Sequence, residues 1–194
     1  MNKILALLSC FIFVSALAGC GAQRRLESKT PEDVLPEFFG EGRGDAFPDF
    51  LVGVWEAEIA NSKWAFKFER DGSILKIIHV LAGEVDLRQE GVYLEGPDEG
   101  TYAVFVMGPC ETQYNASERE LRVKIVLDYY QMVLPQGDLE GKSYDYFKGP
   151  VSEDGKIWKA EWRSYSWLEG ADPPNADAIE AEPIPLVFMK LKIE

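Results

Sequence analysis

Few side chains in this chain have the types and spacing that catalysis or metal binding requires. His79 is the only histidine, so a zinc site built from several histidines, or from cysteine and histidine together, has too few ligands. A Ser-His-Asp triad would need His79 as its base, yet no Gly-x-Ser-x-Gly motif accompanies it. The sequence therefore predicts no catalytic residue, no metal site, no cofactor and no enzymatic activity.

Carboxylates are abundant, with 33 Asp and Glu against 20 Lys and Arg. Adjacent acidic pairs such as Asp98-Glu99 and Glu153-Asp154 stand among turn-forming residues, where a solvated surface is the expected role. A hydrolase that uses two carboxylates across a cleft remains an alternative, because a sequence does not give their separation. The net charge of −13 repels phosphate backbones, which predicts that nucleic acid is not a partner.

One cysteine, Cys20, stands where a covalent modification is expected. A short positive segment, Met1-Asn2-Lys3, precedes an apolar run from Ile4 to Leu17. That run is shorter than the roughly 20 residues of a relaxed transmembrane helix, so residues 1–19 are interpreted as a signal peptide. Its end, Leu17-Ala18-Gly19-Cys20, resembles the lipobox of bacterial lipoproteins.

This resemblance implies that the Cys20 thiol receives a diacylglycerol, that residues 1–19 are removed, and that the new amino terminus is acylated, with palmitate as an expected chain. Several acyl chains together make membrane anchoring effectively permanent. Gly21 follows the cysteine, which by the same resemblance implies the outer membrane if the envelope is Gram-negative. An ordinary secreted protein with a chance cysteine near its cleavage site is the alternative.

The mature chain divides into a tether and one domain. Residues 20–48 are charged, contain glycine and have no sustained apolar period, so we expect a tether with one short helical start at Thr30-Pro31. Residues 49–194 are long enough for one domain with its own hydrophobic core. Cys110 is then the remaining thiol, interpreted as a half-buried structural residue, with a reactive thiol as the alternative.

The domain shows alternating apolar and polar residues between turn signals, which is typical of antiparallel sheets. Asp71-Gly72 predicts a hairpin. A two-residue turn there would pair Phe68 with Leu75, Phe66 with Ile77 and Trp64 with His79. Asp154-Gly155 predicts a second hairpin that pairs Val151 with Trp158, Gly149 with Ala160, Lys148 with Glu161 and Phe147 with Trp162. The opposite charges of Lys148 and Glu161 support that register.

Further strands are predicted at Gly53 to Ile59, Glu84 to Leu94, Thr101 to Met107, Leu121 to Val133, Glu140 to Phe147 and Leu186 to Ile193. Only Asn175 to Ala181 suggests a short helix. This pattern predicts an all-β fold, an antiparallel up-and-down barrel of about eight to nine strands in which the last strand pairs with the first. A two-sheet β-sandwich is the alternative.

The first predicted strand contains Gly53-Val54-Trp55, which is similar to the Gly-x-Trp opening of lipocalins and lipocalin-like domains. The segment from Phe66 to Asp71-Gly72 resembles the second-strand hairpin of small bacterial members. The resemblance implies a helical turn over Phe47 to Leu51, a tryptophan that plugs one end of the barrel and a small apolar ligand inside it. Arg163 is the candidate for the arginine that packs on this tryptophan in the family.

Two functions follow from these expectations. In the first, the barrel holds a small hydrophobic ligand, contacted by inward residues: Trp64, Phe66, His79, Trp158 and Trp162. In the second, the same aromatic residues fill the barrel, and the protein presents loops such as Gly108 to Glu120 or Glu169 to Pro185 to an envelope protein. A filled interior and an exposed apolar patch near a loop would favour the second function.

Overall fold

The computed structural model describes residues 45–59, 62–79, 83–86, 89, 91–96, 98–168 and 183–192. The predicted signal peptide, Cys20, the helical start at Thr30 and the short helix at Asn175 to Ala181 all lie outside the described residues. Within them, one turn of 3-10 helix, η1 (Asp49–Leu51), precedes eleven strands. No helix among these residues is long and apolar enough to cross a membrane.

The strands follow one another along the chain as β1 (Gly53–Ile59), β2 (Ser62–Phe68), β3 (Ile74–His79), β4 (Gly83–Asp86), β5 (Gly91–Glu95), β6 (Tyr102–Met107), β7 (Glu111–Asn115), β8 (Glu120–Leu134), β9 (Gly137–Pro150), β10 (Ile157–Leu168) and β11 (Ile184–Lys190). They form one antiparallel sheet in the order β4-β3-β2-β1-β11-β10-β9-β8-β6-β5, and β7 pairs with β8 beside β6. The all-β antiparallel prediction is confirmed.

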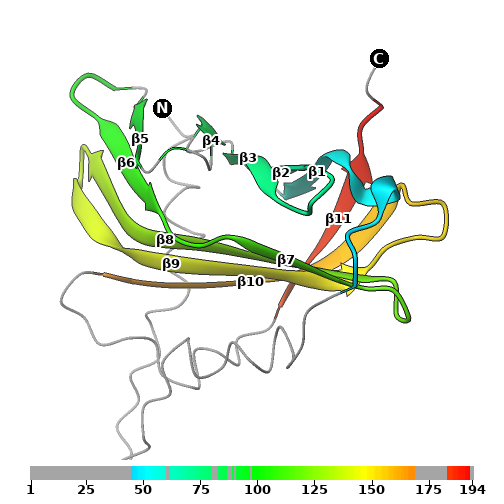
Figure 1. Ribbon diagram of the computed structural model, residues 1–194. Helices are drawn as coiled ribbons and strands as arrows, with labels where there is room; N and C mark the ends of the chain where they lie inside the picture. Colours follow the sequence, from blue (N-terminus) through cyan, green and yellow to red (C-terminus); the bar gives the residue numbers. More distant parts are fainter. Residues whose placement is uncertain are drawn as a thin grey trace, which may run out of the picture.

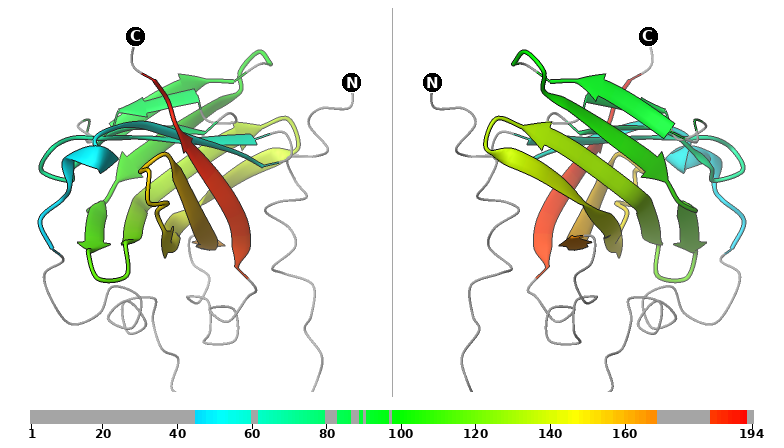
Figure 2. Two further views of the ribbon diagram at one scale, coloured as in Figure 1. Left: turned by 90° about the vertical axis from the view of Figure 1, so that its right-hand side faces the viewer. Right: turned by 90° about the vertical axis from the view of Figure 1, so that its left-hand side faces the viewer.

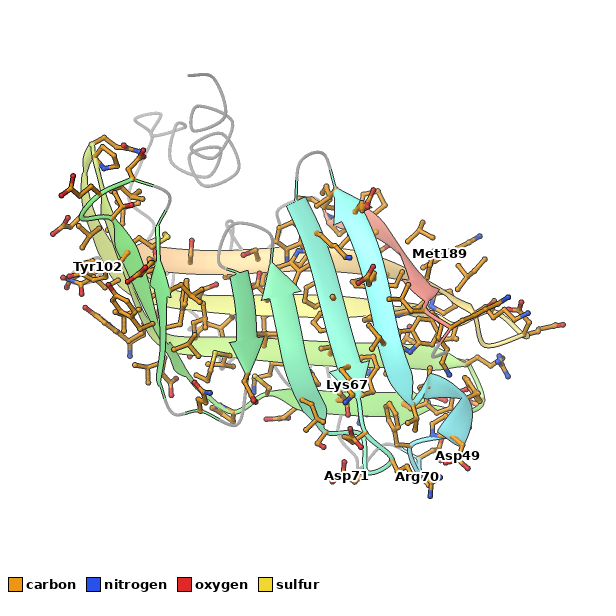
Figure 3. The ribbon with its side chains drawn as sticks, turned by 90° about the horizontal axis from the view of Figure 1, so that it is seen from above. Asp49, Lys67, Arg70, Asp71, Tyr102 and Met189 are labelled. Atoms are coloured by element: carbon orange, nitrogen blue, oxygen red, sulfur yellow. The ribbon has the colours of Figure 1, made fainter. Side chains whose placement is uncertain are left out.

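The sheet is strongly curled into a half-barrel (Figure 1). Seen from above, β1 to β4 cross over β8 to β10, so the sheet folds over its own inner face (Figure 3). The corner lies where β1 meets β11, through the pairs Trp55 with Lys190 and Glu56 with Met189. This joint confirms the prediction that the last strand pairs with the first. The free edges of the sheet are β4 and β5, which follow each other in the chain.

The described residues contain more strands than the eight to nine expected, for two reasons. The segment predicted as one strand from Glu84 to Leu94 forms two strands, β4 and β5. Strand β7 was not predicted, because only Tyr114 among its residues is buried and it has no apolar alternation to reveal it. As a result, much of the segment from Gly108 to Glu120, expected to be a loop, is part of the sheet.

The first hairpin confirms most of the predicted register and corrects one pair. Trp64 pairs with His79 and Phe66 with Ile77, as predicted, but Phe68 pairs with Ile74 rather than Leu75. The turn is longer than two residues: the Glu69 amide donates to Ser73 O at 2.9 Å, and Gly72 has φ +83°. A bulge next to Phe68 then restores the original register.

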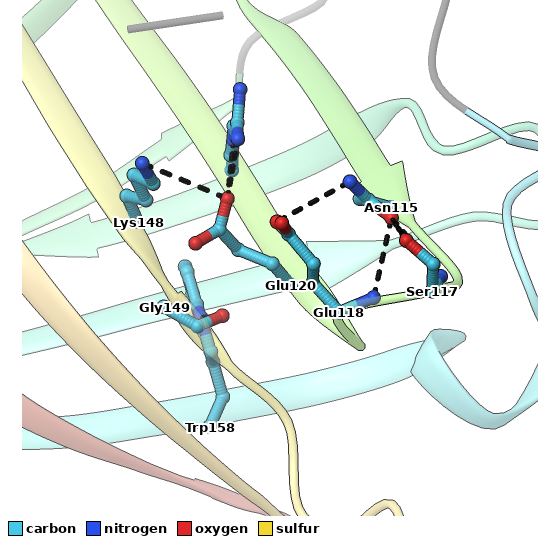
Figure 4. Close-up of polar contacts among 8 residues, drawn as sticks. Asn115, Ser117, Glu118, Glu120, Lys148, Gly149 and Trp158 are labelled. Atoms are coloured by element: carbon cyan, nitrogen blue, oxygen red, sulfur yellow. Dashed lines mark hydrogen bonds and ion pairs between the residues drawn. The ribbon is translucent and has the colours of Figure 1, made fainter.

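The second hairpin has the predicted register, with Val151 opposite Trp158, Lys148 opposite Glu161 and Phe147 opposite Trp162. Gly149 explains why these strands approach so closely. A Cβ at this position would lie 1.8 Å from Lys159 O, so only glycine fits. Its own carbonyl accepts a hydrogen bond of 3.1 Å from the buried Trp158 indole (Figure 4).

Two clusters of buried residues lie on the inner face of the sheet, and further buried residues, among them Tyr146 and Tyr165, lie outside them. The larger joins residues of η1, β1 to β3 and β7 to β11, and we call it the aromatic cluster; its large members are Trp55, Trp64, Phe66, Phe68, Tyr114, Phe147, Trp158 and Phe188. The smaller contains Val92, Phe105 and Tyr130. It belongs to a region that we call the wing: β5, β6 and residues 127–141 of β8 and β9, which curl upward at the left of Figure 1.

Candidate functional site

One end of the half-barrel is closed by Trp55 and the 3-10 turn that precedes it. Trp55 is fully buried, and its indole N–H donates to Leu51 O at 2.8 Å. Lys190 Nζ lies 5.9 Å from the Trp55 ring centroid and donates to Phe50 O at 2.7 Å, while burial lowers the pKa of this ammonium. The expectation for Arg163 was wrong: it pairs with Tyr146 on the outer face, and Lys190 supplies the cation.

Four of the five predicted ligand-contacting residues lie together on the inner face. The ring centroids of Trp64 and Trp162 are 5.5 Å apart, and those of Phe66 and Trp158 are 6.1 Å apart. The fifth, His79, pairs with Trp64 through the backbone, and its side chain lies outside what the structure describes. The hairpin registers predicted from the sequence therefore place these four aromatic side chains next to one another on the inner face.

Further aromatic side chains fill the space between them. Phe188 stacks on Trp158 at 4.6 Å between centroids, and Phe66 lies 5.3 Å from Phe188 and 5.1 Å from Phe147. Phe66, Phe147, Trp158 and Phe188 each have 0 % exposed surface, so no water-sized space adjoins them. A ligand that touched Phe66 or Trp158 would have to displace these packed rings.

A buried carboxylate, Asp145, lies beside the aromatic cluster on the same inner face. It accepts hydrogen bonds from the Trp162 indole at 2.9 Å and from the Ser143 hydroxyl at 3.2 Å. Burial raises the pKa of Asp145, and hydrogen bonds from Ser164, Trp162 and Ser143 act in the opposite direction. We did not predict this residue, although its position two residues before the inward Phe147 was a signal for it.

The inner face of the wing is apolar and less completely covered. Val92, Phe105 and Tyr130 are buried, and burial raises the pKa of the Tyr130 phenol. Around them lie partly buried apolar residues: Leu94, Ala103, Met107, Leu127, Met132 and Leu139. Fewer apolar side chains are buried on the inner face of the wing than at the closed end.

The outer face of the wing is rich in tyrosine and valine. Tyr93, at 60 % the most exposed large hydrophobic side chain among the described residues, stacks on Tyr102 with 5.5 Å between ring centroids. Val106 is also exposed. The same face continues across β6 and β8 through cross-strand pairs: Tyr102 with Val133, Val104 with Gln131, and Val106 with Tyr129.

Carboxylates lie along two margins of this face, and the exposed Lys142 follows Glu140 on the same side of β9. A shallow hollow of about 330 Å³ lies at the β5–β6 turn, lined by Tyr93, Tyr102 and neighbours that include Glu95, Asp98 and Glu99. On the other side, Gln131 Nε2 donates to Glu140 at 2.9 Å, and the exposed Asp138 lies opposite Val133. The outer face of the wing is therefore an apolar patch with an acidic rim.

A second exposed apolar row runs along the outer side of β11 and just past its end. Val187, Met189 and Leu191 point outward, with exposed fractions of 52 %, 50 % and 40 %, while the inward Leu186 and Phe188, which alternate with Val187 and Met189, are buried. We call these three residues the β11 stripe. Ile184 at the start of β11 is exposed as well. Ile184 is part of the segment from Glu169 to Pro185 that was expected to meet a partner, and the β11 stripe begins just after it.

Charged residues at the closed end have structural partners. Glu120 Oε1 forms ion pairs with Arg122 Nη2 at 2.6 Å and with Lys148 Nζ at 3.8 Å (Figure 4). Asn115 Oδ1 accepts the amide N–H groups of Ser117 and Glu118, which fixes the β7–β8 turn (Figure 4). Among the described residues, no group of three or more His, Cys, Asp or Glu side chains is arranged to hold a metal ion.

No protein-family model, characterised protein or solved structure matches the chain. The functional argument therefore depends on the geometry of this molecule: a closed end filled by aromatic rings, and two exposed apolar surfaces at opposite ends of the molecule. Figure 3 labels one residue of each surface, Tyr102 and Met189.

Proposed function

We propose that this chain is a lipid-anchored protein of the bacterial cell envelope that binds an envelope protein through the outer face of the wing and has no enzymatic role. The observation that carries the proposal is the exposed tyrosine patch on a domain whose closed end is filled with side chains. Large exposed apolar patches with polar rims are typical of protein interaction sites.

The anchor in this proposal is the lipid on Cys20. It is supported by the lipobox-like Leu17-Ala18-Gly19-Cys20 at the end of an apolar run. Residues 21–44 then connect the lipid to Asp45, whose amide N–H donates to Tyr114 O at 2.9 Å. The contacts of the domain thus begin earlier than the boundary expected at Asp49.

The patch also defines the chemistry of the partner. Tyrosine anchors give large contact area with little loss of side-chain entropy, and they are enriched among residues that dominate binding energy. The acidic rim, with Glu95, Asp98, Glu99, Asp138 and Glu140, complements a partner surface that is apolar in its centre and basic at its margin.

Site-specific photocrosslinking in cells tests this surface. A benzophenone side chain in place of Tyr93 is expected to give one discrete adduct with an envelope protein. The matched control carries the same group in place of Glu153, an exposed residue of the β9–β10 turn at the other end of the molecule, and is expected to give none. Absence of an adduct from Tyr93, Tyr102 and Val106 alike would reject the wing as the binding surface.

The anchor has its own test. Cys20→Ser is expected to move the protein from the membrane fraction to the soluble fraction or to leave it unprocessed. A processed Cys20→Ser protein that still sediments with membranes would contradict the lipid anchor.

A small apolar ligand remains the second candidate function, and one observation favours it. The inner face of the wing carries partly buried apolar residues, and Asp145 lies on the same side of the sheet. Native mass spectrometry of the chain without residues 1–20, before and after organic extraction, would detect a bound species. A near-stoichiometric ligand would favour this function, and Met132→Trp should then reduce its occupancy by filling the space.

A further inference from the structure

The β11 stripe has no function in the proposal above, although apolar strand residues are rarely left exposed without a reason. Val187 and Met189 alternate with fully covered inner residues, so their outward direction is fixed by the pairing of β11 with β10. Pro185 precedes them on the same face. The row continues past the strand to Leu191, whose amide N–H donates to Val54 O at 2.8 Å.

The charges around the stripe are mixed, in contrast to the acidic rim of the wing. Val187 lies opposite Lys159, and Met189 lies between Ile157 and Glu56. Glu56 forms an ion pair with Lys63, and Pro185 lies opposite Glu161. The exposed side chains of Lys156 and Lys192 lie at the C-terminal end of the row, and Lys156 Nζ is 3.7 Å from Asp154. Lysines among apolar residues suit a phospholipid surface, because their long stems let the ammonium reach the headgroups.

The stripe also lies at the end where the chain enters the domain from the proposed anchor. Lys190, between Met189 and Leu191, donates from Nζ to Phe50 O at 2.7 Å, and residues 45–50 are the first that the structure describes. The first of these residues, Asp45, donates from its amide to Tyr114 O at 2.9 Å. A tether that begins at Cys20 therefore reaches the domain at the same end of the molecule as the stripe, where Figure 3 labels Asp49 and Met189. The wing lies at the far end of the molecule (Figure 3).

The area of the stripe distinguishes a bilayer from a protein partner. Three side chains about half exposed offer roughly 250 Å² of apolar surface, whereas a stable protein interface buries about 800 Å² on each partner. A second copy of this chain would also bring a second strong negative charge. For a protein already held at the membrane by lipid, a weak contact is enough, because the local concentration of the bilayer is high.

We infer that the β11 stripe docks on the phospholipid bilayer and orients the anchored domain so that the wing faces away from the membrane contact. This inference rests on the proposed lipid anchor. It assigns a separate role to each exposed surface: the stripe contacts lipid, and the wing contacts protein.

The experiment uses the full lipidated chain in vesicles of phosphatidylethanolamine with a minor fraction of phosphatidylglycerol. In a Cys110→Ser background, Met189→Cys carries an environment-sensitive fluorophore, and Tyr93→Cys carries the same dye as the matched control. We expect the dye at position 189 to shift to the blue and to be quenched several-fold more by nitroxide-labelled lipid than the dye at position 93. With the dye moved to Leu191→Cys, adding Val187→Glu should abolish the quenching while the protein stays anchored.

Three results would overturn the inference. Anchored protein with a water-like emission at position 189 would reject the docking and leave the anchor intact. Protein that does not associate with the vesicles at all would reject the anchor and the docking together. A blue shift that needs added envelope proteins, and is absent in protein-free vesicles, would assign the stripe to a protein partner instead of lipid.

Discussion

The closed end and the wing of this half-barrel are built from the same sheet but are stabilised very differently. Among the described residues, seventeen buried ones pack in one cluster at the closed end, and Trp55, Trp158 and four phenylalanine rings there have no exposed surface. The cluster described in the wing has three buried residues and a border of partly buried ones. Because a domain needs one well-packed core and not two, the closed end can supply most of the stability and leave the wing free to present an apolar, tyrosine-rich surface.

The largest expected difference between the two regions involves glycine. Gly149→Ala places a Cβ against the Lys159 backbone, which cannot move without separating β9 from β10. We expect a loss of more than about 4 kcal/mol in the free energy of unfolding, or failure to fold. The control is Gly91→Ala in the wing, where the nearest atom is Phe105 O at 3.8 Å and a change within about 0.5 kcal/mol is expected. Urea unfolding followed by tryptophan fluorescence measures both.

The aromatic residues give the next comparison. Trp158→Ala should cost about 3–5 kcal/mol, because it removes a fully buried ring in contact with Phe66, Phe147 and Phe188. Phe105→Ala in the wing should cost less, since fewer side chains surround it and they can close the gap. Equal losses in urea unfolding would mean that the wing is as tightly packed as the closed end.

The buried Asp145 should give the closed end a distinct pH dependence. Burial raises its pKa above the unfolded value of 3.8, so the folded state holds this proton more tightly than the unfolded chain. Its contribution to stability is therefore greatest below pH 3.8 and falls as the pH rises through the folded pKa, at most about 1.4 kcal/mol per pH unit. Asp145→Asn removes this fall. The difference in unfolding free energy between the two proteins across pH 4 to 8 measures it, and a constant difference would mean that Asp145 titrates normally.

Lys190→Met is expected to have a smaller effect, about 1 kcal/mol, from loss of the cation over Trp55 and of the bond to Phe50 O. Methionine keeps the apolar contact of the lysine stem. Thermal unfolding measures the change, and a destabilisation above about 3 kcal/mol would show that this bond organises the whole closed end.

Tyr93→Ser should have the smallest effect on stability, within about 0.5 kcal/mol, because the ring is mostly exposed. Its effect should appear in partner binding alone, as loss of the crosslinked or co-purified protein. A large loss of stability without loss of binding would reverse the roles assigned to the two regions.

The sequence was informative where local rules decide structure. Asp71-Gly72 and Asp154-Gly155 located two hairpins, and the coherent aromatic face fixed their registers except at the bulge beside Phe68. The Gly53-Val54-Trp55 segment correctly indicated a helical turn and a buried tryptophan. Local rules fail for β7, which is mostly polar and is held by its pairing with β8 and by contacts of Thr112 and Tyr114 with distant parts of the chain. They also do not reveal Lys190 over Trp55, since that contact joins the two ends of the domain.

The functional surfaces were harder to predict for a related reason. The alternation of residues along β5, β6 and β11 predicts which side chains point inward. It does not show that both faces of these strands are apolar and that the outer one is exposed to solvent. Val187 and Met189 resemble core residues when read alone. Only the pairing of β11 between β1 and β10 shows that they face outward.

The position of the open edge has a consequence for folding. Apart from the local branch at β6, β7 and β8, the one pairing between strands distant in the chain is β1 with β11, and the free edges, β4 and β5, are consecutive. A circular permutant would have its chain opened between Asp86 and Gly91 and its present ends joined near Val54 and Leu191. Its strands would then follow one another along the sheet as a simple meander that starts at β5 and ends at β4. That circular permutant would have a much lower contact order and should reach the same structure faster, since no long loop must close before the core can form.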